Sequence, residues 1–242
     1  NGDLSSWNVE NILNMREMFY GATSFNQDIS GWDVSNVTNM QGMFAHSGFN
    51  QNIGGWDVSN VTDMSFMFAH SPFNQDIGVW SEKTEKVLTM SHMFAYNRSF
   101  NQNIGNWVVA DLKDTSYMFW NSTSFNQDIG NWNLEAVQTT RGMFQATRSF
   151  NSPMYGNIGA WNASDMSYMF HLATSFNQDI SAWDVQAASN VTGMFKFARS
   201  FNQDLSGWTF WSGLTKCSDF VRKAPGYSFP DDKKPTFPNT CQ

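Results

Sequence analysis

The chain is built from one short motif repeated along most of its length. A Met-Phe pair occurs eight times in 242 residues, at intervals of 24 to 26 residues. A Phe-Asn pair follows each of them, and then an Ile or Leu stands three residues before a Trp. The Met-Phe pairs are Met18-Phe19, Met43-Phe44, Met67-Phe68, Met93-Phe94, Met118-Phe119, Met143-Phe144, Met169-Phe170 and Met194-Phe195. A unit of this size cannot bury its large side chains alone, so neighbouring units must stack and share one continuous core.

Each unit carries signals for two short elements. Residues Phe25–Ile29 alternate apolar and polar side chains, which predicts a short strand. In the following segment Met40, Met43 and Phe44 fall at i, i+3 and i+4 after an Asn, which predicts a capped helix of about two turns. The predicted caps are Asn14, Asn39, Asp63, Thr89, Asp114, Thr139, Asp165 and Asn190. One parallel strand and one short helix per 25 residues define an α/β coil.

Stacking of such units aligns equivalent polar residues in rows about 4.8 Å apart. One row consists of Asn26, Asn50, Asn74, Asn101, Asn126, Asn151, Asn177 and Asn202. A neighbouring row mixes Asp with Asn, and Asp179 and Asp204 are its densest pair of carboxylates, so they are candidate ligands for calcium. The simpler interpretation of this row is a solvated polar edge. His46 and His70 share one position in adjacent units and are expected to stack as polar side chains on an outer face.

The motif resembles a known family. The phrases Phe-Asn-Gln-Asp-Ile-Ser-Gly-Trp-Asp-Val-Ser-Asn-Val-Thr-Asn-Met (25–40) and Met-Phe (43–44) are similar to the 26-residue repeat of bacterial surface proteins. This is the BspA-like leucine-rich repeat, which is also found in mycoplasma lipoproteins, and the resemblance covers about residues 1–208. It implies a leucine-rich-repeat-like solenoid, secreted or at a cell surface, with adhesion proposed and no catalytic residues defined.

Together, the period and the resemblance predict an α/β, leucine-rich-repeat-like solenoid of about eight 25-residue units with a C-terminal cap. Residues 1–208 form the repeat solenoid in this interpretation, and residues 209–242 form the cap, because the pattern stops after Trp208. Asn1 to Trp7 match the middle of a unit, so we expect the chain to be part of a larger chain or assembly.

The cap contains both cysteines. Zinc would need two further ligands, and a catalytic thiol would need a His partner, and neither is present nearby in the sequence. We therefore expect Cys217 and Cys241 to form a disulfide, which favours an oxidising, extracellular or cell-surface location. Candidate glycosylation sites fit that location but add little, because Asn, Ser and Thr are abundant. They are Asn36, Asn60, Asn97, Asn121, Asn162 and Asn190.

Charge and motif content exclude several classes of function. The net charge is −7 and Lys and Arg are scattered singly, so no basic surface for nucleic acid is expected. Apolar runs are too short for a membrane span. The sequence contains no nucleophile elbow, Walker loop, zincin helix or dinucleotide fingerprint, so we expect no enzyme activity and no cofactor, with calcium as the open exception.

Aromatic residues outside the repeat consensus are the candidates for partner binding, because the core does not explain them. They are Trp120, Tyr96, Tyr155, Phe210 and Trp211. The sequence thus predicts a non-enzymatic, extracellular or cell-surface repeat module that acts as a structural scaffold or an adhesion and protein-interaction surface. The alternative is a carbohydrate- or calcium-dependent recognition domain, and the expected partner is a protein or a surface glycan.

Overall fold

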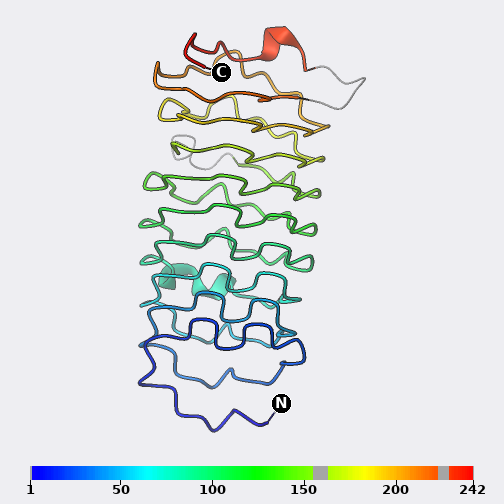
Figure 1. Ribbon diagram of the computed structural model, residues 1–242. Coiled ribbons are helices and arrows are strands. Elements are labelled where there is room, and N and C mark those ends of the chain that lie inside the picture. The colour runs from blue at the N-terminus through cyan, green and yellow to red at the C-terminus, as the bar shows by residue number, and fades with distance from the viewer. Residues whose placement is uncertain (1, 155–162, 223–228, 242) are drawn as a thin grey trace.

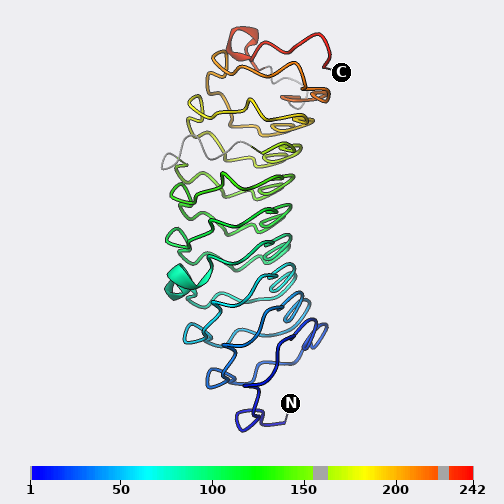
Figure 2. The same cartoon turned by 90° about the vertical axis from the view of Figure 1, so that its left-hand side faces the viewer.

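The computed structural model describes residues 2–154, 163–222 and 229–241. The chain forms a stack of irregular coils along one axis, with its two ends at opposite ends of the stack (Figure 1). Viewed from the side, the stack is elongated, and each coil lies directly above the preceding one (Figure 2). Each coil holds one repeat, because the residues that precede successive Met-x-x-Met-Phe segments pair in parallel, as Asn14 with Asn39 and Asn39 with Asp63.

The prediction of an α/β, leucine-rich-repeat-like solenoid was wrong. The helices of the described residues are two 3-10 helices, η1 (Gly78–Lys83) and η3 (Asp231–Lys233). Parallel pairing is limited to isolated bridges, and residues 2–154, 163–222 and 229–241 contain neither an α-helix nor a continuous strand. The repeats therefore stack without the strand-plus-helix unit that their sequence pattern predicts.

The segment expected to be helical is instead a ribbon of tight turns. In the second repeat the amides of Gly42, Phe44 and His46 donate to carbonyls of the next coil at 2.7, 3.0 and 2.8 Å. The intervening amides of Met43 and Ala45 donate to carbonyls three residues back, both at 3.1 Å. An α-helix would use every amide within itself, so this alternation excludes it.

Left-handed backbone positions interrupt the ribbon at regular intervals. Gly42 has φ 59° and His46 has φ 57°, four residues later, and the same two positions have positive φ in the other repeats. A right-handed helix cannot pass through such residues. Met40, Met43 and Phe44 are nevertheless fully buried, so the ribbon satisfies the same apolar pattern as the predicted helix.

The predicted helix caps have a related but different role. Asn39 Oδ1 accepts a hydrogen bond from the Gln41 amide at 2.9 Å, and Asp63 Oδ1 accepts one from the Ser65 amide at 2.8 Å. A side-chain oxygen that binds the amide two residues on forms an Asx turn. The residue types that cap helices therefore start the turn ribbon here.

The Asn row predicted from the sequence is a hydrogen-bonded ladder. Asn26 Oδ1 accepts from the Asn50 amide at 2.8 Å, and Asn50 Oδ1 accepts from the Asn74 amide at 2.8 Å. The same bond is repeated up to Asn202, which confirms the alignment of equivalent residues. In this segment the amides of the next coil bind Asn side-chain oxygens in place of backbone carbonyls. The segment expected to be a strand therefore lacks the backbone hydrogen bonds that define one.

One continuous apolar core runs through the stack. Phe44 stacks on Phe49 of its own coil at 4.0 Å between ring centroids and on Phe68 of the next coil at 5.8 Å. The buried Trp56 donates its indole N–H to the Ile29 carbonyl at 3.2 Å, so a core residue also links neighbouring coils. Helix η1 lies where the repeat lengthens, and it keeps Trp80 fully buried.

The end of the chain continues the stack. The amides of Val191 and Phe195 donate to the carbonyls of Lys216 and Phe220, both at 2.8 Å, so the coil after Trp208 keeps the register of the repeats. Cys217 and Cys241, the pair expected from the sequence, are joined by a disulfide with their Cα atoms 5.8 Å apart. The last segment therefore covers the apolar end of the core and is fixed to the coil beneath it.

The energetic contrast between core and polar edge is testable. Trp56→Ala removes a fully buried ring and its hydrogen bond, and we expect a loss of about 3–5 kcal/mol in the free energy of unfolding. Asp76→Asn keeps the oxygen that binds the Gly78 amide at 2.9 Å and should have almost no effect. Denaturant melts of both variants measure the difference. A larger loss for Asp76→Asn than for Trp56→Ala would contradict this account.

Candidate functional site

Three side chains of each turn ribbon occupy positions on one outer face of the stack. We call them the first wall, floor and second wall positions, represented in the third repeat by Phe66, Ala69 and His70. The first wall positions are Glu17, Gly42, Phe66, His92, Tyr117, Gly142, Tyr168 and Gly193. The floor positions are Tyr20, Ala45, Ala69, Ala95, Trp120, Gln145, His171 and Lys196. The second wall positions are Gly21, His46, His70, Tyr96, Asn121, Ala146, Leu172 and Phe197.

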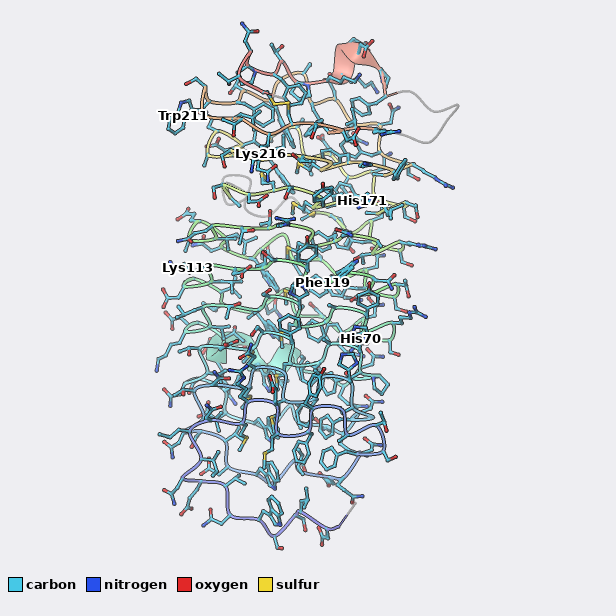
Figure 3. The ribbon with its side chains drawn as sticks, in the orientation of Figure 1. His70, Lys113, Phe119, His171, Trp211 and Lys216 are labelled. Carbon is cyan, nitrogen blue, oxygen red and sulfur yellow. A yellow bond between two sulfur atoms is a disulfide. The ribbon has the colours of Figure 1, made fainter. Side chains whose placement is uncertain are left out.

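Three consecutive alanines at the floor position create a groove. Ala45, Ala69 and Ala95 form a small apolar cluster of their own, separate from the main core. Tyr20 and Trp120 occupy the floor position in the repeats before and after them and close the groove at both ends. The groove has a volume of about 380 Å³, within the range of ligand pockets. His70 lies on this face in Figure 3, with His171 further along the same side of the stack.

Aromatic rings stacked from coil to coil form the two walls. On the second wall, the ring centroids of His46 and His70 lie 4.2 Å apart, and those of His70 and Tyr96 lie 4.4 Å apart. The interplanar angles of the two pairs are 14° and 9°. The His46–His70 stacking expected from the sequence is confirmed. On the first wall, the rings of Phe66 and His92 stack with their centroids 4.4 Å apart and an interplanar angle of 8°. Because neighbours cover most ring faces, the groove is lined mainly by ring edges and imidazole nitrogens.

Trp120 closes one end of the groove, and its ring packs edge-to-face against the stacked rings of both walls. Its ring lies 4.7 Å from Tyr96 at 65° and 6.3 Å from His92 at 69°. Edge-to-face pairs of this kind stabilise aromatic clusters. The end wall is therefore held by contacts to both sides of the groove.

Two histidines of the groove, His70 and His92, have a lowered pKa. Burial lowers the pKa of His70, and the neighbouring His46 and Arg98 lower it further. Burial also lowers the pKa of His92, although the carboxylate of Asp114 acts in the opposite direction. The imidazoles of His70 and His92 therefore favour the uncharged state at neutral pH.

This preference predicts a loss of stability on mild acidification. The folded-state pKa values of His70, His92 and His171 lie below the ordinary value of 6.5, so the unfolded chain binds protons first as the pH falls. Stability should be constant above about pH 7.5 and fall between about pH 6.5 and pH 5.

Thermal melts across that pH range provide the measurement. A triple variant with His70→Gln, His92→Gln and His171→Gln should show a flatter dependence of melting temperature on pH. Parallel curves for the wild type and the triple variant would show that other groups are responsible.

The structure brings two of the five predicted partner-binding aromatics together, since Tyr96 and Trp120 both line the groove. Phe210 is half-buried near the C-terminus and stacks on Phe237 at 5.5 Å. Trp211 is 65% exposed and lies on the opposite side of the stack from His70 (Figure 3). Tyr155 lies outside the described residues.

Sequence reasoning placed His46 and His70 on an outer face but missed other residues of the groove. Phe66, His92 and Tyr20 were not among the candidates, and the alanines at the floor position received no attention. The signal was available, because the same position carries a large aromatic side chain in the repeats on either side, Tyr20 and Trp120.

The candidate calcium ligands form turns. Asp179 Oδ1 accepts from the Ser181 amide and Asp204 Oδ1 from the Ser206 amide, both at 2.9 Å. These hydrogen bonds lower the pKa of both carboxyls, mainly through the backbone of Ser181 for Asp179 and through the side chain of Ser206 for Asp204. In the described part of the chain, no three or more His, Cys, Asp or Glu side chains form a group that could hold a metal ion.

The candidate glycosylation sites differ in accessibility. Asn97 is fully buried, and its side-chain amide donates to the Phe73 carbonyl at 2.9 Å. Asn36 and Asn60 each donate to a carbonyl of the preceding coil at 2.8 Å. Asn121 and Asn190 are half-buried, and Asn162 lies outside the described residues. A glycan on Asn97 is incompatible with this packing.

No helix within the described ranges has the length and apolar character that a membrane span requires.

Comparison with known proteins gives one match. The family model described as Mycoplasma protein of unknown function, DUF285, matches residues 1–84, 49–158 and 154–229. This agrees with the mycoplasma-type repeat expected from the motif, whereas the assignment to the BspA-like leucine-rich repeat is not confirmed. No curated protein and no solved structure matches the chain.

Proposed function

The chain belongs to the family described as Mycoplasma protein of unknown function, DUF285, and we propose that it is a non-enzymatic repeat module that binds a partner protein in its aromatic groove. The stack of coils serves as the rigid scaffold in this proposal, and the groove is the interaction surface. The single observation that carries it is the run of three alanines on a face that is otherwise filled by side chains.

The groove has the composition of a recognition site. Tyr20, Tyr96 and Trp120 border it, and Tyr and Trp are the residues that most often dominate binding energy at protein interfaces. Phe66 is 39% exposed and Tyr20 is 57% exposed, although a structural stack has no need to leave such rings in water. These rings support binding as the role of this face.

The ring orientation favours a protein segment over a sugar. A sugar packs its C–H groups against open aromatic faces, but along the second wall His46, His70 and Tyr96 cover one another's faces, and on the first wall His92 covers one of the two faces of Phe66. Ring edges, imidazole nitrogens and an apolar floor suit the alternating apolar and polar groups of an extended peptide. A protein partner is therefore the occupant that we propose, in preference to a carbohydrate.

We further propose an extracellular or cell-surface location. The Cys217–Cys241 disulfide supports it, because structural disulfides form and persist mainly in oxidising compartments. The role proposed for the groove requires only binding and no reaction at the site.

Filling the groove tests the proposed function. A library of random peptides displayed on phage, selected on the intact chain, should yield binders that lose about tenfold or more in affinity for Ala69→Trp. The added ring would occupy the groove, and the backbone accommodates it because Trp120 stands at the same floor position in the fifth repeat. The melting temperature should change little.

The matched control is Gln145→Trp, which adds the same ring at the floor position of the sixth repeat, outside the groove. Selected peptides should bind this variant as well as the wild type. Binders that tolerate Ala69→Trp, or a selection that yields no binders, would show that the groove is not a peptide-binding site.

A further inference from the structure

The first wall of the groove has no side chain at one position. Phe66 stacks on His92, and His92 lies 4.9 Å from Tyr117, but the preceding repeat has Gly42 at this position. The one non-adjacent atom found within 4 Å of a Cβ placed on Gly42 is Glu17 Cγ, at 3.3 Å. Since His92 covers one face of Phe66, the other face of that ring is open toward this gap.

A second glycine occurs at this position further along the wall, and there the Tyr117 ring of the preceding repeat lies over it, where a Cβ would project. The sixth repeat has Gly142 at the first wall position, and Arg141 precedes it. The Arg141 guanidinium carbon lies 6.0 Å from the Tyr117 ring centroid and 5.9 Å from that of Tyr168. Its Nε also donates to the Tyr117 hydroxyl at 2.9 Å. A planar cation therefore fits between the aromatic side chains of this wall.

The gap at Gly42 has no such cation from the second repeat. The residue equivalent to Arg141 is Gln41, which lines the groove and is uncharged. Glu17 is the carboxylate beside the gap, and its contact with Arg16 at 3.3 Å joins side chains that are 51% and 56% exposed. Exposed pairs of this kind contribute little to stability, so the Glu17 carboxylate is available to a competing cation.

The electrostatics of the groove favour a positively charged occupant. The chain has a net charge of −7. His46, His70 and His92 line the groove, and the lowered pKa of His70 and His92 favours the uncharged state of those two imidazoles at neutral pH. Arg98 acts on His70 as a fixed positive charge, and it is not among the residues that line the groove.

We propose, on the basis of the function proposed above, that the partner segment carries an arginine whose guanidinium stacks on the open face of Phe66, above Gly42, and pairs with the Glu17 carboxylate. Arginine fits better than lysine because its planar guanidinium both stacks on an aromatic ring and binds a carboxylate through two N–H groups. The rest of the segment then lies along the alanine floor toward Trp120.

Two blocked pentapeptides test this inference by titration followed with NMR. One has arginine at the centre of four alanines, and the other has citrulline, which has nearly the same shape but no charge. The arginine peptide should bind about tenfold more tightly than the citrulline peptide. Glu17→Gln and Phe66→Leu should each remove most of that difference and leave the weaker affinity for citrulline unchanged.

Three further variants give matched controls. Arg16→Ala removes the cation that competes for Glu17 and should strengthen binding of the arginine peptide. Gln41→Arg supplies a guanidinium from the chain itself, as Arg141 does in the sixth repeat, and should abolish binding of that peptide. Glu135→Gln removes an exposed carboxylate outside the groove and should change nothing.

The outcomes separate this inference from the proposed function. The arginine assignment would be overturned by equal affinity for the two peptides or by no measurable binding of the arginine peptide. It would also be overturned if Phe66→Leu reduced the affinity for both peptides equally. The proposed function would still stand if the phage-selected peptides depended on Ala69. Arginine binding that persists in Ala69→Trp would place the guanidinium outside the groove and would also overturn the inference.

Discussion

Hydrogen bonds between successive coils determine the rest of this structure. Every second amide of the turn ribbon donates to a carbonyl one repeat further along, as Gly42 does to Ser65 and Phe66 does to Ser91. The Asn ladder adds a side-chain bond at each coil, and the buried indoles, such as that of Trp56, add another. Because these bonds join equivalent positions, each repeat is held in register with its neighbours.

Register has a direct consequence for function. Equivalent side chains lie in rows along the stack, so a change of residue type in consecutive repeats creates a continuous surface feature. The floor row illustrates this, because three alanines between Tyr20 and Trp120 are enough to open a groove. The same row in later repeats carries Gln145, His171 and Lys196, which cover the face instead.

The period of the sequence predicted the rows but not the local backbone. The Asn ladder and the His46–His70 stack follow from the repeat spacing alone, because any stacked coil aligns them. The i, i+3, i+4 pattern of Met40, Met43 and Phe44 predicted a helix, yet a ribbon with a left-handed residue at every fourth position buries the same side chains. Apolar spacing cannot distinguish the two, because it records which side chains are inside and not where the amides point.

The sequence analysis did not predict the residues with positive φ, because most of them are not glycine. Glycine at Gly42, Gly142 and Gly193 was a hint, because glycine adopts positive φ without strain. The same position holds Phe66 at φ 58° and His92 at φ 57°, and residues of this size seldom adopt that conformation. Tyr96 and Trp120 could be selected as aromatics outside the consensus, whereas Phe66 became a candidate only when the structure placed it across the groove from them.

Positive φ occurs in the repeats that form the groove and also in the other repeats, as at Ala146 and Phe197. It is therefore a property of the repeat fold and not of the groove. The identity of the outer side chains is then free to vary at little cost to the stack, because the core and the inter-coil bonds do not depend on them. In the sixth to eighth repeats this freedom gives a closed face, with Arg141 between two tyrosines and Lys196 paired to Asp219 at 2.7 Å. In the second to fourth repeats it gives three alanines, one glycine and an exposed ring. The difference between a covered face and an open groove therefore depends on a few outer residues of the turn ribbon.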